Sequence, residues 1–535
     1  MVDNAIRFVL ITCSGKMSFM DSISLSIFAS RINAICEEMG AVLQCTALSP
    51  NIKDRLDFSC AVFDPAGELC AQAAHIPVHL GSMAYAMSGI VTALKWQAGD
   101  MVVVNDPYLG GTHLPDVTLI APLFIDDALL GFVTNRAHHA DIGATTPGSM
   151  PISKSLEEEG VIIPPTFIVR AGVVDEAVLA EITGESRNSF QSHGDYSAQL
   201  SANRCGLARL EALIVLMGVV PYREALVALN DYAERLALSS LNQIPDGRYR
   251  FHDVMDDDGM GQKDIRIEVC LHAKQGRMHL DFNGTAQQVM GNINCPLSVA
   301  AAAAFYVFRC LMPTHTPACA GSFRPITLAI PQGTLLNARR PAAVAAGNVE
   351  TSTRTVDVVM GALAQAIPGK IPAASHGSMN NVAMGGTQSR GGQMQAWDYY
   401  ETIGGGMGAG AIKNGLSAVQ THMTNTRNTP IESLEMHYPL RLRRYAIRDG
   451  SGGTGRQKGG DGIIREYEFL AQTTVTLLTE RRYHAPWGLA GGGAGSVGIN
   501  RLANETVDAK QCFEVHAGDR LTIKTPGGGG WGKEK

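Results

Sequence analysis

Glycine clusters dominate the last third of the chain and constrain how that region folds. They occur at 404–406, 450–455, 491–493 and 527–530. Because glycine lacks a Cβ atom, it permits tight turns and the close approach of two backbones. This density therefore indicates a mostly β region with many turns. No fixed-period repeat accompanies the clusters, so a solenoid or a propeller is not expected.

Two glycine-rich segments, 450–455 and 493–498, match the G-x-G-x-x-G pattern of dinucleotide-binding loops. That pattern cradles a pyrophosphate only where it follows a strand and opens an apolar helix. Neither segment opens such a helix, and the first runs into the polar stretch 456–460. The P-loop pattern G-x-x-x-x-G-K-S/T does not occur in the sequence. We therefore assign nucleotide binding to neither segment.

The N-terminal half combines helical and strand periodicity. Apolar residues recur at three- and four-residue spacing in 21–43, and helical periodicity returns in 200–238, so we expect helices there. Shorter apolar runs next to turn residues predict strands at 58–63, 101–104 and 129–134. Polar loops follow two of these strands, which makes the loops the first place to look for chemistry.

These two polar loops carry the strongest chemical signal in the sequence. Histidine nitrogens and aspartate oxygens are donors of the kinds that bind Zn²⁺, Mn²⁺ or Fe²⁺. Pro115 disfavours a helical arrangement of the first loop, so a turn must orient its side chains. The first loop, 105–116, contains His113 and Asp116, and the second, 135–143, contains His138, His139 and Asp141.

The alternative is that these polar side chains only bond to the backbone of their own turns. The sequence contains 15 histidines, and three of them fall in these two loops, which favours a metal site.

The region that follows the second expected helix is β-rich. Apolar and polar residues alternate in 248–254, 264–272 and 277–282, and an alanine-rich helix is expected at 297–310. The expected fold is mixed α+β and multi-domain, with a helical and short-strand metal domain followed by a β-rich, glycine-rich C-terminal region. Its expected parts are a lead-in at 1–20, a metal-binding domain at 21–240, a β-rich domain with a helix at 241–340, and a glycine-rich α/β domain at 341–535.

Composition excludes several classes of protein. The net charge is -6 and no basic stripe occurs, so nucleic acid is not an expected partner. The longest apolar runs, 213–220 and 299–308, fall short of the ~20 residues that cross a bilayer. Residues 1–18 lack a small-residue cleavage site. The 11 cysteines occur without a C-x-x-C pair, which indicates reduced thiols. We therefore expect a cytoplasmic protein with no membrane contact.

Two further polar segments leave alternatives open. The segment 422–432 is dense in amide and hydroxyl groups, which suits either substrate recognition or a network of turns. Glu480-Arg481-Arg482 suits either an anion site or a structural ion pair, and we favour the ion pair.

With these residues in view, the chain resembles the hydantoinase B/oxoprolinase family over about 21–532. That family includes subunits of ATP-dependent hydantoinases, caprolactamase, 5-oxoprolinase, and acetone and acetophenone carboxylases. Where family members often have Glu-Arg-Arg before Asp-Phe-Ser, this chain has Asp54-Arg55-Leu56. The matching segments are 49–59, 75–83, the two histidine loops, 147–150, 159–165, 194–199, 424–432, 450–455 and 530–532.

The resemblance implies a division of labour between two polypeptides. A kinase-like partner of the hydantoinase A type uses ATP with Mg²⁺ and phosphorylates a small cyclic amide. The B-type subunit then completes the reaction at a divalent metal, zinc first and manganese as the alternative. A two-plus-two heterotetramer is the expected assembly. The ligands that the family motifs imply are His113, Asp116 and His138, with Asp57 as the fourth.

The resemblance also implies a mechanism. Phosphorylation of the carbonyl oxygen removes amide resonance, and the metal assists attack by water on the activated carbon. His139 or Asp141 would orient a ligand or move a proton. A ketone carboxylase subunit is the alternative activity, and a non-catalytic scaffold for the ATP-binding partner is the third hypothesis.

Overall fold

An antiparallel seven-stranded sheet organises the N-terminal half of the chain, in the order β4-β3-β7-β6-β5-β8-β9. The computed structural model describes residues 7–11, 17–73, 76–390 and 392–534. The strands are β3 (Phe58–Phe63), β4 (Leu69–Gln72), β5 (Met101–Val104), β6 (Asp116–Ile125), β7 (Ala128–His138), β8 (Thr166–Arg170) and β9 (Val173–Val174).

Helices cover both faces of this sheet. Side chains alternate along a strand, so Cys60 and Val62 of β3 join one core, whereas Ala61 and Phe63 join another. The first core is completed by α1, α5 and α6, and the second by α3. The α-helices in the described part of the chain are α1 (Ser22–Thr46), α2 (Pro50–Lys53), α3 (Pro77–Ala93), α4 (Glu176–Gly184), α5 (Ser189–Met217), α6 (Val219–Leu241), α7 (Leu297–Leu311), α8 (Ser352–Ala366) and α9 (Ile431–His437).

The helical region expected at 200–238 is divided into α5 and α6. Gly218 separates them with a φ of +87°, a conformation that glycine adopts readily and other residues rarely do. Among the described residues, no single helix is long and apolar enough to cross a membrane. The pair α5 and α6 reaches that length and composition only together, and it is bent by 106°.

A second, four-stranded sheet follows, in the order β10-β11-β12-β13. The hairpin between β11 and β12 turns at Gln275-Gly276. Both α7 and α8 pack beside this sheet and share its core, although α8 lies beyond the boundary expected at residue 340. The domain boundaries stay predictions. The strands are β10 (Gly247–Asp257), β11 (Lys263–Lys274), β12 (Arg277–Asp281) and β13 (Ile326–Ala329).

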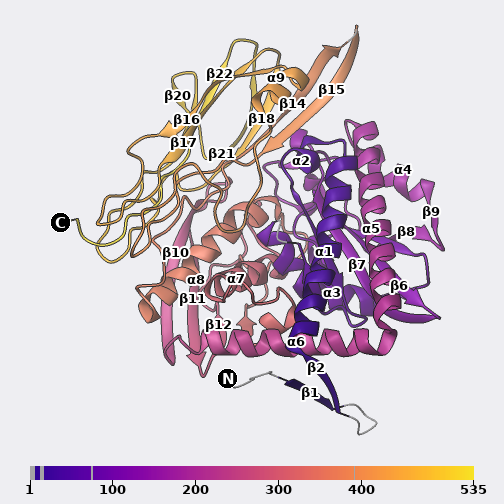
Figure 1. Cartoon of the computed structure of the whole chain (residues 1–535). Helices are drawn as coiled ribbons and strands as arrows, with labels where there is room; N and C mark the ends of the chain where they lie inside the picture. Colours follow the sequence, from indigo (N-terminus) through magenta and orange to yellow (C-terminus); the bar gives the residue numbers. More distant parts are fainter. Residues whose placement is uncertain (1–6, 12–16, 74–75, 391, 535) are drawn as a thin grey trace.

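Two further sheets form the C-terminal region, drawn in orange and yellow in Figure 1, where they stand above the N-terminal half. They share one core, to which Val382 and Tyr399 contribute from one sheet and Tyr467 and Leu521 from the other. The first contains β14 (Asn381–Arg390), β15 (Gln393–Glu401), β18 (Thr473–Leu478) and β21 (Lys510–Val515); the second contains β16 (Leu440–Arg448), β17 (Gly462–Phe469), β19 (Ile499–Leu502), β20 (Glu505–Thr506) and β22 (Arg520–Lys524).

Several glycine segments lie backbone against backbone beside these sheets. Gly406 donates its N–H to Pro526 O at 3.0 Å, and Gly528 donates to Gly460 O at 2.9 Å. A Cβ atom on Gly406 would lie 1.9 Å from Gly460 O, and one on Gly528 would lie 2.1 Å from Met407 O. These glycines therefore permit a close approach that no other residue allows.

The expected mixed α+β, multi-domain fold is confirmed, with a helix-rich N-terminal region and a strand-rich C-terminal region. Of the lead-in expected at 1–20, residues 1–6 and 12–16 lie outside the described residues. The backbone of the rest contributes to an antiparallel pair of strands, β1 (Arg7–Ile11) and β2 (Met17–Asp21).

Candidate metal centre

Strand register brings the two histidine loops together. The antiparallel pairing of β6 with β7 places Asp116, the first residue of β6, opposite His138, the last residue of β7. The turn of this hairpin is Asp126-Asp127, and both residues have positive φ angles, as a two-residue turn of this kind requires. His138 N–H also donates to Asp57 O at 3.0 Å, which brings the start of β3 to the same end of the sheet.

His113 reaches this point through the turn expected at Pro115. Asp116 N–H donates to His113 O at 3.1 Å and closes that turn. The His113 Nδ1 atom lies 3.1 Å from Ala345 O, far along the chain. Because a carbonyl oxygen only accepts, Nδ1 carries the proton of the neutral ring, and Nε2 keeps a lone pair. That lone pair faces the centre, where Nε2 lies 3.2 Å from Asp116 Oδ1.

His113, Asp116 and His138 form one buried group whose ligand atoms all lie within 4.8 Å of one another. The Nδ1 atom of His138 lies 3.2 Å from Asp116 Oδ1. The Nε2 atoms of His113 and His138 are buried without a hydrogen-bond partner. Orphaned nitrogens are rare in protein interiors, and two nitrogens with one carboxylate oxygen form a typical donor set for a divalent metal. The group therefore fits a divalent metal ion.

The three side chains affect the pKa values of one another. Burial favours the neutral form of the Asp116 carboxyl, but His113 and His79 outweigh it and hold its pKa well below 3.8. Burial also opposes protonation of His113, yet the Asp116 carboxylate raises the pKa of that ring. For His138, burial prevails and lowers the pKa. The ionised Asp116 and the neutral His138 fit the protonation pattern that a metal ion requires, whereas at His113 a bound metal would take the place of the proton that Asp116 favours.

Asp57, the fourth ligand that the resemblance implies, lines the same small cavity but lies outside the group of three. Its Oδ2 atom is 3.6 Å from Arg55 Nη2, and its Oδ1 atom is 3.9 Å from His79 Nε2. Its role as a ligand therefore stays a prediction.

His79 was not predicted as a site residue, yet its Nε2 atom lies 3.2 Å from Asp116 Oδ2. It belongs to the first turn of α3, which begins at Pro77. Proline at the first position of a helix is a recognisable start signal. That signal, together with the histidine two residues later, was available in the sequence but did not show which way the helix would face.

His139 and Asp141 make their contacts elsewhere. Side chains alternate along an extended chain, so His139 points away from His138. Its Nε2 atom lies 2.9 Å from Gln199 Oε1, and burial lowers its pKa. Asp141 accepts from the backbone N–H of Arg187 and pairs with its guanidinium at 3.3 Å. Asp141 also accepts from Gly143 N–H and Ser149 Oγ, so it fixes the loop that follows β7, and neither residue belongs to the group of three.

Residues far away in the sequence complete the walls of the centre. The π-helix Gly347–Thr351 carries Asn348, whose Nδ2 donates to Asp116 Oδ2 at 3.2 Å. The ring of Tyr400 stacks on His138 with 4.7 Å between centroids. Thr112 Oγ1 donates to Asp116 Oδ2 at 2.5 Å. Short π-helices occur often at functional sites, but they carry no sequence signal that would have revealed Asn348 in advance.

The polar segment 422–432 also reaches the centre. Thr424 and Thr426 line its cavity, whereas Asn428 donates to Glu401 Oε2 and Thr402 O at 2.9 Å each. The segment thus contains a network of turns and also faces the centre, so neither alternative is excluded. Arg481, by contrast, forms ion pairs with Asp253 at 2.9 Å and Asp357 at 2.6 Å, in agreement with the favoured interpretation.

Comparison with curated proteins identifies relatives along almost the whole chain. The chain is 40% identical to 5-oxoprolinase 1 of Arabidopsis thaliana over 96% of its own length and 42% of that protein. It is 32% identical to the B-type subunit of a putative D-/L-hydantoinase of Pseudomonas sp. (strain NS671), over 96% of its own length and 90% of that protein. The chain thus spans less than half of the plant oxoprolinase and most of the bacterial protein.

Solved structures share the fold. An ATP-dependent caprolactamase from Pseudomonas jessenii superposes with a TM-score of 0.89 and 26% identity, over 96% of this chain and 91% of the other. An acetone carboxylase superposes with a TM-score of 0.86 and 18% identity, over 96% and 76%. The model of the hydantoinase B/oxoprolinase family matches residues 21–534. The chain therefore belongs to the hydantoinase B/oxoprolinase family.

Proposed function

We propose that this chain is the metal-bearing subunit of an ATP-dependent cyclic amide hydrolase, which acts on a substrate phosphorylated by a kinase-like partner. The observation that carries the proposal is the buried group of His113, Asp116 and His138 with its two orphaned nitrogens. Buried nitrogens without partners are costly in a protein that only acts as a scaffold. The names of the relatives supply the substrate class: oxoproline, hydantoin and caprolactam are all cyclic amides.

In this proposal the group of three holds the metal with Asp57 as the fourth ligand, zinc first and manganese as the alternative. When bound, a divalent metal supplies Lewis-acid catalysis and lowers the pKa of water. Thr112 and Asn348 engage the Oδ2 atom of Asp116, so its Oδ1 atom stays directed at both histidines. Their role is to keep the carboxylate from turning.

His79 is placed to move a proton, and Asp57, the proposed fourth ligand, lies beside it. The Nε2 atom of His79 lies 3.2 Å from Asp116 Oδ2 and 3.9 Å from Asp57 Oδ1, on the wall of the same cavity. We assign to His79 the general-base step on water and the return of the proton to the leaving nitrogen. His139 and Asp141, which we expected to take part, keep a positioning role through Gln199 and Arg187.

The kinase step is assigned to a separate polypeptide. The related bacterial protein is named as one subunit of a hydantoinase, and the related plant oxoprolinase is more than twice as long as the aligned segment. We therefore propose a hydantoinase A-type partner that uses ATP and Mg²⁺, in a cytoplasmic two-plus-two heterotetramer. Ketone carboxylation is the second candidate activity, because the same fold occurs in an acetone carboxylase.

The test is to supply the purified pair with ATP and a panel of lactams, hydantoins and ketones, each with and without bicarbonate. Ring opening without bicarbonate, coupled to ATP hydrolysis and lost after chelation, is the expected result. Turnover of ketones alone, and only with bicarbonate, would replace the hydrolase by a carboxylase. Full activity of metal-free pairs would refute the role of the metal group in either case.

A further inference from the structure

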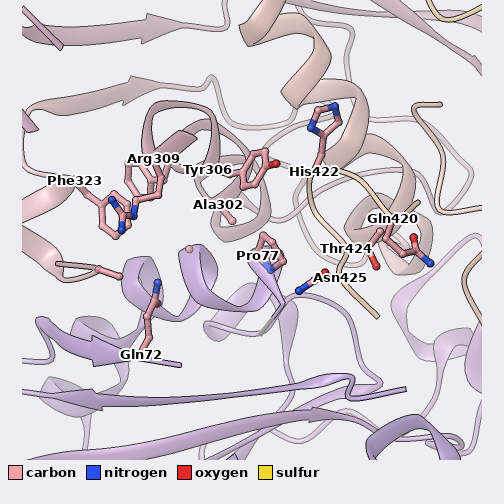
Figure 2. Close-up of a pocket in the computed structure, with 13 residues that line it drawn as sticks. Gln72, Pro77, Ala302, Tyr306, Arg309, Phe323, Gln420, His422, Thr424 and Asn425 are labelled. Carbon is pink, nitrogen blue, oxygen red and sulfur yellow. The ribbon is translucent and has the colours of Figure 1, made fainter. Parts of the chain in front are cut away.

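A cavity of about 140 Å³ lies where the C-terminal region meets the N-terminal half, between α2, the start of α5, β15 and α9 (Figure 1). No described residue lines both this cavity and the metal centre. The larger pocket drawn in Figure 2 differs in this respect, because its Thr424 also lines the metal centre. The smaller cavity is therefore a separate site. Its lining includes four amide side chains, those of Asn188, Gln191, Gln388 and Gln395.

The buried carboxyl group of Asp398 lines this cavity and lacks a counter-charge. Its Oδ1 atom has no hydrogen-bond partner. Arg187 acts on it electrostatically but pairs with Asp141 instead, at 3.3 Å. Burial, together with Asp141 and Asp195, raises the pKa of Asp398 to about 7. A buried carboxylate without a partner is costly, and an ammonium group on a ligand would supply both the missing charge and hydrogen bonds.

A positive charge lines the same cavity. Lys53, the last residue of α2, is part of the lining, and within the described part of the chain it forms no ion pair within 4.0 Å. Helix α5 also begins here, with Asn188 as its N-cap and Gln191 in its first turn. The N-terminal end of a long helix carries a partial positive charge. Lys53 and the start of α5 therefore both favour a carboxylate on the ligand.

The two charged side chains leave room for a ligand between them. Lys53 and Asp398 line one small cavity, yet they do not pair with each other within 4.0 Å. The segments that carry them also meet beside the metal centre: Arg55, which follows α2, donates to Tyr400 O of β15 at 2.8 Å. The ring of Tyr400 in turn stacks on His138. A ligand that joins α2 to β15 thus lies behind the wall of the centre without entering it.

We propose that this cavity binds a small molecule with one amine and one carboxylate, its ammonium group on Asp398 and its carboxylate on Lys53. The source of such a molecule rests on the proposed function. Hydrolysis of a cyclic amide breaks the ring C–N bond, adds the hydroxyl of water to carbon and its proton to nitrogen, and leaves both groups on one product. The amine gains a further proton at neutral pH. The cavity is thus a product site outside the metal centre.

Calorimetric titration of the full chain at pH 8, at which Asp398 is mostly ionised, tests this assignment. The probe is 4-aminobutyrate, the opened form of 2-pyrrolidinone. Its single-charge analogues, n-butylamine and butyrate, should each bind at least tenfold more weakly, and binding should persist with a metal chelator present. Equal binding of either analogue, or loss of binding with the metal, would overturn the inference. L-Alanine, whose two charges are adjacent, should also bind more weakly, and equal binding would overturn the assignment to a product.

Variants locate the ligand. Asp398→Asn and Lys53→Gln should each lower the affinity for 4-aminobutyrate at least tenfold, whereas Lys413→Gln, at an exposed position, should leave it unchanged. Ala396→Phe places a ring in the cavity, leaves both charged groups intact, and should lower the affinity as much. Thermal unfolding verifies that each variant is folded. Wild-type affinity in Asp398→Asn or in Ala396→Phe would show that the ligand lies elsewhere and overturn the inference.

The outcomes separate this inference from the proposed function. If the pair hydrolyses lactams but 4-aminobutyrate does not bind in the cavity, only the inference fails. If 4-aminobutyrate binds and depends on Asp398 and Lys53 while no cyclic amide is hydrolysed, the proposed function fails and the binding site stands.

Discussion

The carboxylate of Asp116 contacts more residues of the metal centre than any other side chain described there. One carboxylate oxygen lies 3.2 Å from a nitrogen of His113 and of His138, and the other oxygen faces His79, Thr112 and Asn348. In a fully buried position, an ionised carboxylate requires this many partners to offset the loss of water. The residue thus links the metal group to the walls that surround it.

Replacing one member of the group should release the metal. We expect His113→Ala to lower bound divalent metal at least tenfold, because it removes a ligand whose lone pair is oriented by Ala345 O. Elemental analysis after size-exclusion chromatography measures this. His516→Ala, at an exposed position, is the matched control and should bind metal like the wild type. Equal metal content in both variants would rule out this group as the site.

Asp398 should make stability depend on pH. Burial, with help from Asp141 and Asp195, raises its pKa from 3.8 to about 7. Between these values the folded chain holds a proton that the unfolded chain has released, so the free energy of unfolding falls as pH rises from about 4 to about 7. Asp398→Asn cannot titrate, so its stability relative to the wild type should increase across this window, by at most about 1.4 kcal/mol per pH unit.

Urea denaturation at pH 5 and pH 8 tests this prediction. Asp449→Asn, at an exposed position, serves as the control and should give the same difference from the wild type at both values. The prediction is wrong if the difference between Asp398→Asn and the wild type does not change with pH.

At the scale of elements, patterns of neighbouring residues predicted most of the helices and strands that local contacts determine. The strands expected at 58–63 and 101–104 match β3 and β5, because apolar runs of that length between turn residues fit a sheet buried on both faces. The break at Gly218 was missed because a single glycine within helical periodicity is often tolerated. His113, Asp116 and His138 were found from two loops close in sequence. Asn348 and Tyr400 were not, because tertiary packing alone brings them there.

Replacement by alanine should change the stability of the chain in opposite directions at two glycines of α3. A Cβ atom on Gly81 would lie 2.6 Å from Ala302 Cα of α7, so Gly81→Ala forces the two helices apart and should destabilise the chain by about 1–3 kcal/mol. Gly89 is exposed, with nothing within 4 Å of its Cβ position. Gly89→Ala should stabilise by about 0.5–1 kcal/mol, because alanine loses less backbone freedom in a helix. Calorimetric unfolding measures both, and equal signs would contradict the packing described.

At the scale of the whole molecule, the glycine segments explain why the C-terminal region could be predicted only in outline. Their density indicated turns and close approaches, but the partners of each approach lie far apart in the sequence. Gly406, for example, meets Gly460 and Pro526. Sequence periodicity carries no information about such pairs. The class of fold was therefore predictable, whereas the arrangement of the glycine segments was not.

If ATP is used by a partner subunit, as proposed, the isolated chain and the assembled pair should behave differently. Alone, the chain should neither hydrolyse ATP nor open a lactam, because no nucleotide-binding pattern occurs in a suitable context. With its partner it should form a stable two-plus-two complex, because a phosphorylated lactam released into bulk water would hydrolyse before metal-assisted attack. Light scattering of the co-expressed pair measures the stoichiometry. An ATPase activity that stays with the isolated chain through further purification would contradict the division of labour.

The hairpin of β6 and β7 has a consequence for the order in which the centre is built during folding. Its two-residue turn at Asp126-Asp127 lets the strands pair through local contacts, which form within microseconds. In that pairing Asp116 lies opposite His138. Ala345, Asn348 and Tyr400 belong to segments more than 200 residues away along the chain, and we expect their docking to be slower because long loops must close. We therefore expect a nascent chain to present Asp116 and His138 as an open pair first and to enclose them last, which would leave time for a metal ion to enter before the walls close.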